Sequence, residues 1–256
     1  MAEWIKVEVE GGVHRITMNR PEVMNALNRD MRSELTGALR AAHSARVIVL
    51  TGAGRGFCSG QDLTDAEGLD AAGFEAILND EYVPMIRAIT EAPVPVIAAV
   101  NGAAVGAGAN LALACDLVIA TESAVFLQAF TRIGLIPDAG GTSFLPRRVG
   151  LQRAMGLALL AEPVSARQAA DWGMIWEAAP DDRFADLVAA RAAKLAAGPT
   201  GTYAALKQAL RGAFDQSLEA QLAVEARLQG ICGASADFRE GVAAFLEKRT
   251  PRFSGR

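Results

Sequence analysis

Apolar and polar residues follow distinct periods in the first half of the chain. Residues 4–19 alternate on both sides of Gly11-Gly12, which predicts two strands joined as a β-hairpin. An amphipathic helix is predicted next, from the three-to-four-residue spacing of Met31, Leu35, Leu39 and Ala42. Residues 45–54 and 94–102 are almost wholly apolar before they end in glycine loops. Such runs are typical of strands that are buried on both faces.

Helical patterns follow these buried strands, near residues 72–91 and from Ala107 onward. The recurrence of strand, glycine turn and helix predicts an α/β fold. From about residue 183 the pattern is nearly all helical, with Gly198-Pro199 as the expected break. We therefore expect a core of residues 1–197 and a helical region of residues 198–256 that packs on the core or on a neighbouring subunit.

Composition and charge narrow the class of protein. The chain has 256 residues, of which 51% are hydrophobic, with a formal net charge of −4. This acidic balance argues against general binding to nucleic acids or anionic membranes. The charged, alternating start does not resemble a secretion signal, and the three cysteines lack disulfide or metal-ligand spacing. We expect a cytoplasmic protein with free thiols and no metal site.

Two glycine-rich loops are the first candidates for chemistry. Residues 52–63 hold four glycines after a buried strand, but they match neither a P-loop nor a dinucleotide fingerprint. Residues 101–111 are small and lead into a helix, whose first N–H groups have no partner in the helix. Each loop alone could be a plain turn or a close packing of backbones. Together, the two loops could direct one N–H each at the same oxygen as an oxyanion hole.

Asp138 is the second candidate, in the stretch "IGLIPDAGGT" of residues 133–142. A carboxylate just before a helix is often its N-cap. A lone carboxylate in apolar surroundings can instead have a raised pKa and move protons. The residues alone leave both interpretations open.

Three motifs carry a resemblance to a known family. "FCSGQDL", "AAVNGAAVGAGANLALACD" and "IGLIPDAGGTSFLPRRVG" together resemble the crotonase (enoyl-CoA hydratase/isomerase) superfamily, and the similarity runs along the whole chain. The resemblance implies a spiral of β-β-α units with a C-terminal helical trimerisation region. It also implies an acyl-CoA thioester as substrate, no separate cofactor, and a homo-oligomer that is a trimer or a dimer of trimers.

The resemblance also implies roles for individual residues. The N–H groups of Ser59 and Ala107 match the oxyanion hole, and Asp138 matches the acid/base of isomerases. Asn110 and Phe130 stand where hydratases carry two glutamates, so hydration is disfavoured. Substrate contacts are implied around both loops and near the C-terminus, at Asn25, Gly60, Gln61, Asp62, Leu63, Gly108, Asn110, Phe130, Phe245 and Lys248.

The motifs most resemble isomerases that convert a ring-epoxide of phenylacetyl-CoA to oxepin-CoA. Two alternatives remain open. One is a straight-chain Δ3,Δ2-enoyl-CoA isomerase or a hydratase-like enzyme of fatty-acid breakdown. The other is a non-catalytic acyl-CoA-binding or scaffold protein.

Overall fold

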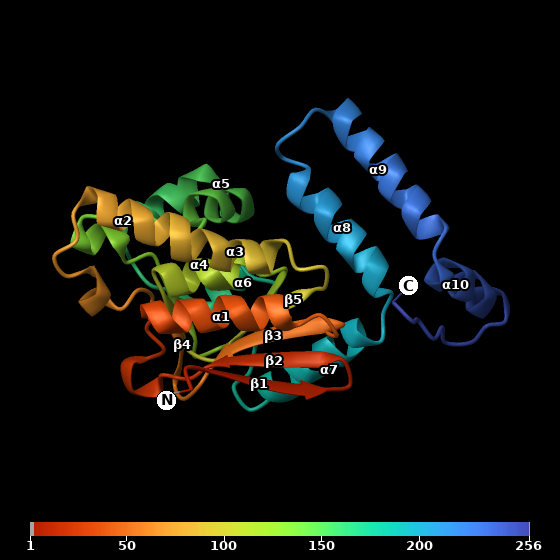
Figure 1. Cartoon of the computed structure of the whole chain (residues 1–256), viewed down its shortest axis with the longest axis horizontal. Helices are drawn as coiled ribbons and strands as arrows, with labels where there is room; N and C mark the ends of the chain where they lie inside the picture. Colours follow the sequence, from red (N-terminus) through yellow and green to blue (C-terminus); the bar gives the residue numbers. More distant parts are fainter. Residues whose placement is uncertain (1–2, 256) are drawn as a thin grey trace.

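The computed structural model describes residues 3–255, and its framework is a six-stranded sheet (Figure 1). The strand order is β1-β2-β3-β5-β7-β10, and every neighbouring pair except β1 and β2 is parallel. The bounds are β1 (Ile5–Glu10), β2 (Val13–Met18), β3 (Val47–Gly52), β5 (Val96–Val100), β7 (Leu117–Thr121) and β10 (Glu177–Ala179). The predicted hairpin is confirmed: Glu10 pairs with Val13, and Gly11 and Gly12 form the turn with positive φ.

A second, smaller sheet has the order β4-β6-β8-β9. Its strands are β4 (Gly56–Cys58), β6 (Ala103–Val105), β8 (Val125–Leu127) and β9 (Val164–Ser165). Strands β4, β6 and β8 each follow a strand of the large sheet after a short loop, and each leads on to helical segments. The chain therefore repeats a strand-strand-helix unit three times. This repetition brings the two glycine-rich loops to the same edge of the small sheet.

Helices cover both faces of the large sheet. They are α1 (Arg29–Ala41), α2 (Ala71–Ile77), α3 (Val83–Thr90), α4 (Ala107–Ala114), α5 (Gly141–Leu160), α6 (Ala166–Asp171) and α7 (Phe184–Ala196). Side chains of β3 alternate between the main core, where Ile48 and Leu50 lie, and the α7 side, where Val47 and Val49 lie. Burial on both faces explains why this strand is wholly apolar.

Two local features differ from the predicted pattern. The helix expected near residues 72–91 consists of α2 and α3 with a π-helical turn, Leu78–Tyr82, between them. Three short 3-10 helices, η1 (Pro21–Val23), η2 (Leu63–Ala66) and η4 (Phe130–Ile133), lie in segments without a clear period. The π turn places Tyr82 in the core.

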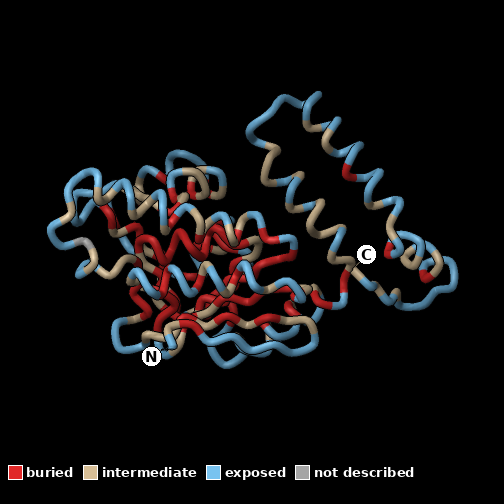
Figure 2. Tube along the Cα trace, in the orientation of Figure 1, coloured by how far each residue is buried: buried red, intermediate tan, exposed pale blue. Residues whose placement is uncertain are grey.

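The C-terminal helices α8 (Thr200–Gly212), α9 (Leu218–Gly233) and α10 (Ala236–Leu246) extend away from the core and are largely exposed (Figures 1 and 2). Two ion pairs join helix α8 to the core. Lys207 pairs with Asp116 at 2.8 Å, and Arg211 pairs with the same carboxylate at 2.7 Å. A domain boundary at 197/198 stays a prediction. Within residues 3–255, no helix combines the length and apolarity that a membrane span requires.

Candidate functional site

A cavity of about 610 Å³ opens where the two glycine-rich loops meet the segment before α5. Apolar side chains form most of its wall, with contributions from α2, η4 and the β6–α4 turn. Seven of the predicted site residues line it, namely Ser59, Gly60, Gln61, Leu63, Ala107, Phe130 and Asp138. Among the described residues that line the cavity, Asp138 is the sole carboxylate and Arg132 the sole cation.

The two loops meet because Gly60 has no side chain. Its backbone has a φ of +94°, which favours glycine. A Cβ at this position would lie 2.8 Å from the Val105 carbonyl oxygen and 3.4 Å from the Ala107 nitrogen. The predicted convergence of the two loops is therefore a direct backbone contact, and it places Gln61 beside the start of α4.

The structure assigns the free donor of the first loop to a different residue from the one predicted. The Ser59 N–H donates to the Met24 carbonyl at 2.9 Å, so the prediction that it completes the oxyanion hole is wrong. On either side of Gln61, the Leu27 N–H donates to Gly60 and the Asp62 N–H donates to Leu27. Because successive N–H groups of an extended chain point to opposite sides, the Gln61 N–H points away from Leu27.

Gln61 and Ala107 supply the two unpaired N–H groups at this edge. Within residues 3–255, no acceptor is paired with the Gln61 N–H. Ala107 is the first residue of α4, and its cap, Gly106, offers no side chain to the helix start. The N–H groups of a first helical turn have no partners within the helix. Both residues line the cavity, which makes their N–H groups the candidate donors to an oxygen bound there.

Asp138 is not the N-cap of the following helix. Helix α5 starts at Gly141 after Gly140, and no cap bond from a side chain is formed. Asp138 Oδ1 is buried and has no hydrogen-bond partner in the described part of the chain. Burial raises the pKa of this carboxyl group to about 6. Asp138 is therefore an acid at the cavity wall with one unpaired oxygen among the described residues and a pKa raised to about 6.

Tyr82 lies within reach of the charge of Asp138, Cys58 lies near Tyr82, and both groups stay neutral. Burial raises the pKa of the Cys58 thiol to about 12, so it is a packed thiol and not a nucleophile. The Tyr82 hydroxyl is buried without a partner among the described residues, and burial together with the negative charge of Asp138 raises its pKa. Sequence reasoning missed Tyr82, because only the π turn brings it here.

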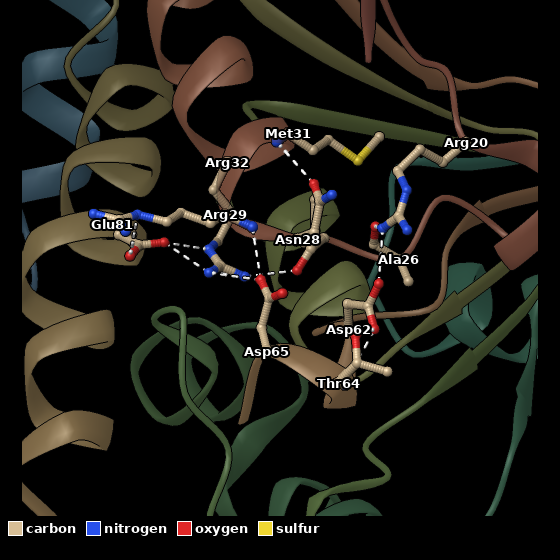
Figure 3. A network of polar contacts seen from close by, with 11 residues as sticks. Arg20, Ala26, Asn28, Arg29, Met31, Arg32, Asp62, Thr64, Asp65 and Glu81 are labelled. Carbon is tan, nitrogen blue, oxygen red and sulfur yellow. Dashed lines mark hydrogen bonds and ion pairs between the residues drawn. The ribbon is translucent and has the colours of Figure 1, made fainter. Parts of the chain in front are cut away.

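Asp62 is not among the residues that line the cavity, and its contacts hold the loop in place (Figure 3). It pairs with Arg20 at 3.0 Å and accepts hydrogen bonds from the N–H and hydroxyl of Thr64. The Thr64 hydroxyl, together with Arg20, holds the pKa of Asp62 below its ordinary value. Asp62 thus has a structural role in this loop, and its contact with substrate stays a prediction.

A neighbouring ion-pair network fixes the next turn of the loop. Arg32, with a side chain 1% exposed, pairs with Glu81 at 2.7 Å and with Asp65 at 3.3 Å (Figure 3). Asp65 also accepts from the Arg29 N–H. These contacts join α1, the π turn and η2, so the wall that carries Leu63 is anchored to the core.

Three other predicted contacts also have structural roles. Asn25 is fully buried; it accepts from the Arg20 N–H and donates to the carbonyls of Ala53 and Gly56. Gly108 lets α4 pack on β4, since a Cβ there would lie 2.3 Å from the Cys58 carbonyl oxygen. Asn110 is buried behind the cavity wall, where it bonds the Asp138 backbone.

Phe245 lies in the last turn of α10 and Lys248 follows the end of that helix, which extends from the core (Figure 1). Phe245 is 82% exposed, and neither residue lines the cavity of its own chain. Their contact with substrate on an adjacent subunit stays a prediction. In the part of the chain that the structure describes, no group of three or more His, Cys, Asp or Glu side chains is placed to hold a metal ion.

Comparisons with known proteins agree with this geometry. The profile of the enoyl-CoA hydratase/isomerase family matches residues 8–256. A probable enoyl-CoA hydratase of Rhodobacter capsulatus is 62% identical over 255 residues, which is 98% of each chain. The 1,2-epoxyphenylacetyl-CoA isomerase of Escherichia coli is 48% identical over the full length of both chains.

Solved structures show the same fold. The crystal structure of the enoyl-CoA hydratase from Bacillus anthracis superposes with a TM-score of 0.93 at 32% identity, covering 99% of this chain and all of that one. The predicted crotonase-type arrangement, with its repeated strand-strand-helix units and C-terminal helices, is confirmed. The chain therefore belongs to the enoyl-CoA hydratase/isomerase family and has the crotonase fold.

Proposed function

We propose that the protein is an acyl-CoA isomerase in which Asp138 moves a proton to and from C2 of the acyl group. The observation that carries this proposal is the buried, unpaired Oδ1 of Asp138, the one carboxylate among the described residues of the cavity wall. A base works best when its pKa is near the working pH. With a pKa of about 6, Asp138 is ionised at neutral pH yet basic enough to accept a proton.

The two free N–H groups supply the other half of the chemistry. When Asp138 takes the C2 proton, the electrons of the C–H bond form an enolate, and negative charge develops on the thioester oxygen. In this proposal the N–H groups of Gln61 and Ala107 stabilise that charge, in place of the pair first expected at Ser59 and Ala107. The enolate then takes the proton back at another carbon, so substrate and product are isomers. The reaction needs no metal and no redox cofactor.

The proposed substrate is a ring-1,2-epoxide of phenylacetyl-CoA. Loss of the C2 proton gives an enolate, the epoxide opens, the ring expands to oxepin-CoA, and the proton returns to the substrate. Two observations support this choice. The E. coli relative is named for this reaction. The cavity is also large enough for a ring, and its wall carries the apolar side chains of Leu63, Phe130 and Leu135.

Hydration of an enoyl-CoA is the second candidate, because the R. capsulatus relative is named a probable enoyl-CoA hydratase. Hydration requires that a water molecule be held and activated as well as a proton delivered. A second carboxylate would serve that purpose, but Asn110 is turned into the core and Phe130 is apolar. The same site would shift a straight-chain Δ3 double bond to Δ2, since that reaction needs a single proton shuttle.

The decisive assay compares wild type with Asp138→Asn on three substrates. These are 1,2-epoxyphenylacetyl-CoA, a straight-chain 3-enoyl-CoA and a 2-enoyl-CoA in water. We expect oxepin-CoA from the first substrate and a loss of about 10³-fold or more in kcat for the variant, which keeps the shape but not the base. Faster hydration of the 2-enoyl-CoA by wild type would favour the hydratase. Turnover that survives in Asp138→Asn would remove Asp138 from the mechanism.

A further inference from the structure

Two buried amide side chains form a chain of hydrogen bonds that ends on the backbone of Asp138. Gln128 Nε2 donates to Asn110 Oδ1 at 2.8 Å, and Asn110 Nδ2 donates to the Asp138 carbonyl oxygen at 2.9 Å. Asn110 is fully buried and Gln128 is 5% exposed. Neither side chain lines the cavity. Buried amides of this kind are costly unless they are paired, so the chain holds its members in defined positions.

The hydrogen bonds at Asp138 are divided unevenly between backbone and side chain. Its carbonyl oxygen accepts from Asn110 and also from the Gly141 N–H at 2.8 Å. Its carboxylate has a buried oxygen that accepts nothing from the described residues. The chain then turns through left-handed backbone at Ala139 and Gly140, with φ of +47° and +82°. Ala139 is strained in this region, so surrounding contacts must hold the turn.

Asn110 is the contact best placed to hold this turn. A Cβ on Gly141 would lie 2.2 Å from Asn110 Nδ2, so the start of α5 is packed directly on the amide. Asn110 also lies in α4, three residues after Ala107. One helix therefore carries both the Ala107 N–H, which the proposed function assigns to the thioester oxygen, and the amide that contacts the loop of the acid.

We propose that Asn110, oriented by Gln128, is a positioning residue that sets Asp138 relative to the oxyanion hole and keeps the Oδ1 atom of its carboxylate free of donors. This inference rests on the proposed function and deepens it. The amide stands at the position where hydratases of the family carry a glutamate, and here it acts on the backbone of the acid, away from the substrate.

A purely structural role for the two amides predicts a different result. Loss of a structural hydrogen bond would lower stability and leave the titration of Asp138 unchanged. Loss of a positioning contact would let the 138–140 turn relax, so that the carboxylate gains water or N–H donors and its pKa falls. The neighbouring ionisable groups do not titrate in the pH range in which Asp138 is measured. Burial raises the pKa of both Tyr82 and Cys58, so both stay neutral below pH 9.

The test uses Asn110→Leu and Gln128→Met, which nearly keep side-chain volume and remove the donors. Thr121→Val is the matched control, because it removes one hydrogen bond of a buried side chain, to Asp181, outside the cavity wall. Carboxyl ¹³C NMR follows Asp138, with its signal assigned through Asp138→Asn. We expect titration near 6 in wild type and the control. In both test variants the pKa should fall toward about 4, the ordinary value of an aspartate.

Kinetics on the proposed substrate supply the second readout. In both test variants we expect kcat to fall about tenfold or more, while KM stays within about threefold, because the acid is displaced and the binding wall is kept. An unchanged Asp138 pKa in both variants would overturn the inference. The NMR measurement needs no turnover, so an inactive wild type would count against the proposed function alone. If Asn110→Leu does not fold, Gln128→Met, one bond further from the loop, decides the matter.

Discussion

The bare carboxylate of Asp138 makes the proposed activity depend on pH. Its pKa is raised to about 6 because burial disfavours the charged form. If Asp138 must be ionised to take the C2 proton, kcat/KM should be level above pH 7 and fall about tenfold for each pH unit below 6. A profile of kcat/KM from pH 4.5 to 8.5 checks this. A profile that stays level down to pH 5 would mean that another group is the base.

The same carboxylate should lower the free energy of unfolding at neutral pH. For an acid whose pKa is raised on folding, stability is full below the unfolded pKa, near 3.8, and is lost as pH rises through about 6. Two pKa units correspond to at most about 3 kcal/mol, and partial exposure of Asp138 reduces this to roughly 1–2 kcal/mol. Asp138→Asn should therefore unfold at a higher temperature than wild type at pH 7.5, with the gap nearly closed at pH 4. Equal melting temperatures at pH 7.5 would contradict the raised pKa.

The sequence alone indicated Asp138 as a candidate acid, and the structure places it on the cavity wall. Asp138 stands out as a lone carboxylate in an apolar segment, and the structure removes the capping alternative. Sequence reasoning could not decide whether Ser59 or Gln61 keeps a free N–H in the first loop. It depends on Met24, which lies 35 positions before Ser59 and takes up the Ser59 N–H. A motif can indicate a loop of free donors, but a distant contact decides which donor stays free.

At the scale of elements, the contact between the two glycine loops should tolerate no side chain. Gly60→Ala would introduce a Cβ 2.8 Å from the Val105 carbonyl oxygen at a φ of +94°. We expect a loss of roughly 1–3 kcal/mol in stability and at least a tenfold loss in kcat, since the Gln61 N–H is displaced. Gly37→Ala is the control, because Gly37 lies on the exposed face of α1 with open space around it.

The control variant Gly37→Ala should gain about 0.5–1 kcal/mol in stability from helix propensity and keep full activity. Chemical denaturation and steady-state kinetics on both variants measure the difference. If Gly60→Ala were as active as Gly37→Ala, the close approach of the two loops would not matter for the site.

The sequence pattern predicted the long strands and helices but not the short ones. Strands β3 and β5 were evident, because burial on both faces requires an apolar run. Strands β4 and β6 have three residues each, too few to show a period, so they appeared as parts of glycine loops. The π turn at Leu78–Tyr82 was also invisible, because one extra residue in a helical turn barely changes the hydrophobic pattern.

At the scale of the whole molecule, the C-terminal helices expose more apolar surface than a stable monomer usually carries. Exposed side chains on α9 and α10 include Leu218, Leu222, Ile231, Phe238, Phe245 and Leu246. The helical pattern predicted the helices themselves, but not what covers them, since that depends on surfaces outside one chain. Such a patch is typical of a protein interface.

We expect a second copy of the chain to cover this surface, as a trimer or a dimer of trimers. Light scattering after gel filtration should then give three or six times the chain mass of 26.8 kDa. Leu222→Glu should shift the mass toward one chain, because a charge in a closed apolar interface is expensive. Ser33→Glu places the same charge at a polar, exposed position of α1, a helix that lies away from α9 and α10 (Figure 1), and should leave the mass unchanged.

The oligomer also bears on the site. If Phe245 reaches the substrate of an adjacent subunit, Phe245→Ala should raise KM several-fold with little change in kcat, since it removes a binding contact that acts equally before and during reaction. Leu222→Glu should raise KM in the same way by separating the subunits. A chain that is monomeric at assay concentration with unaltered KM would show that one subunit builds the whole binding site, with α9 and α10 serving some other contact.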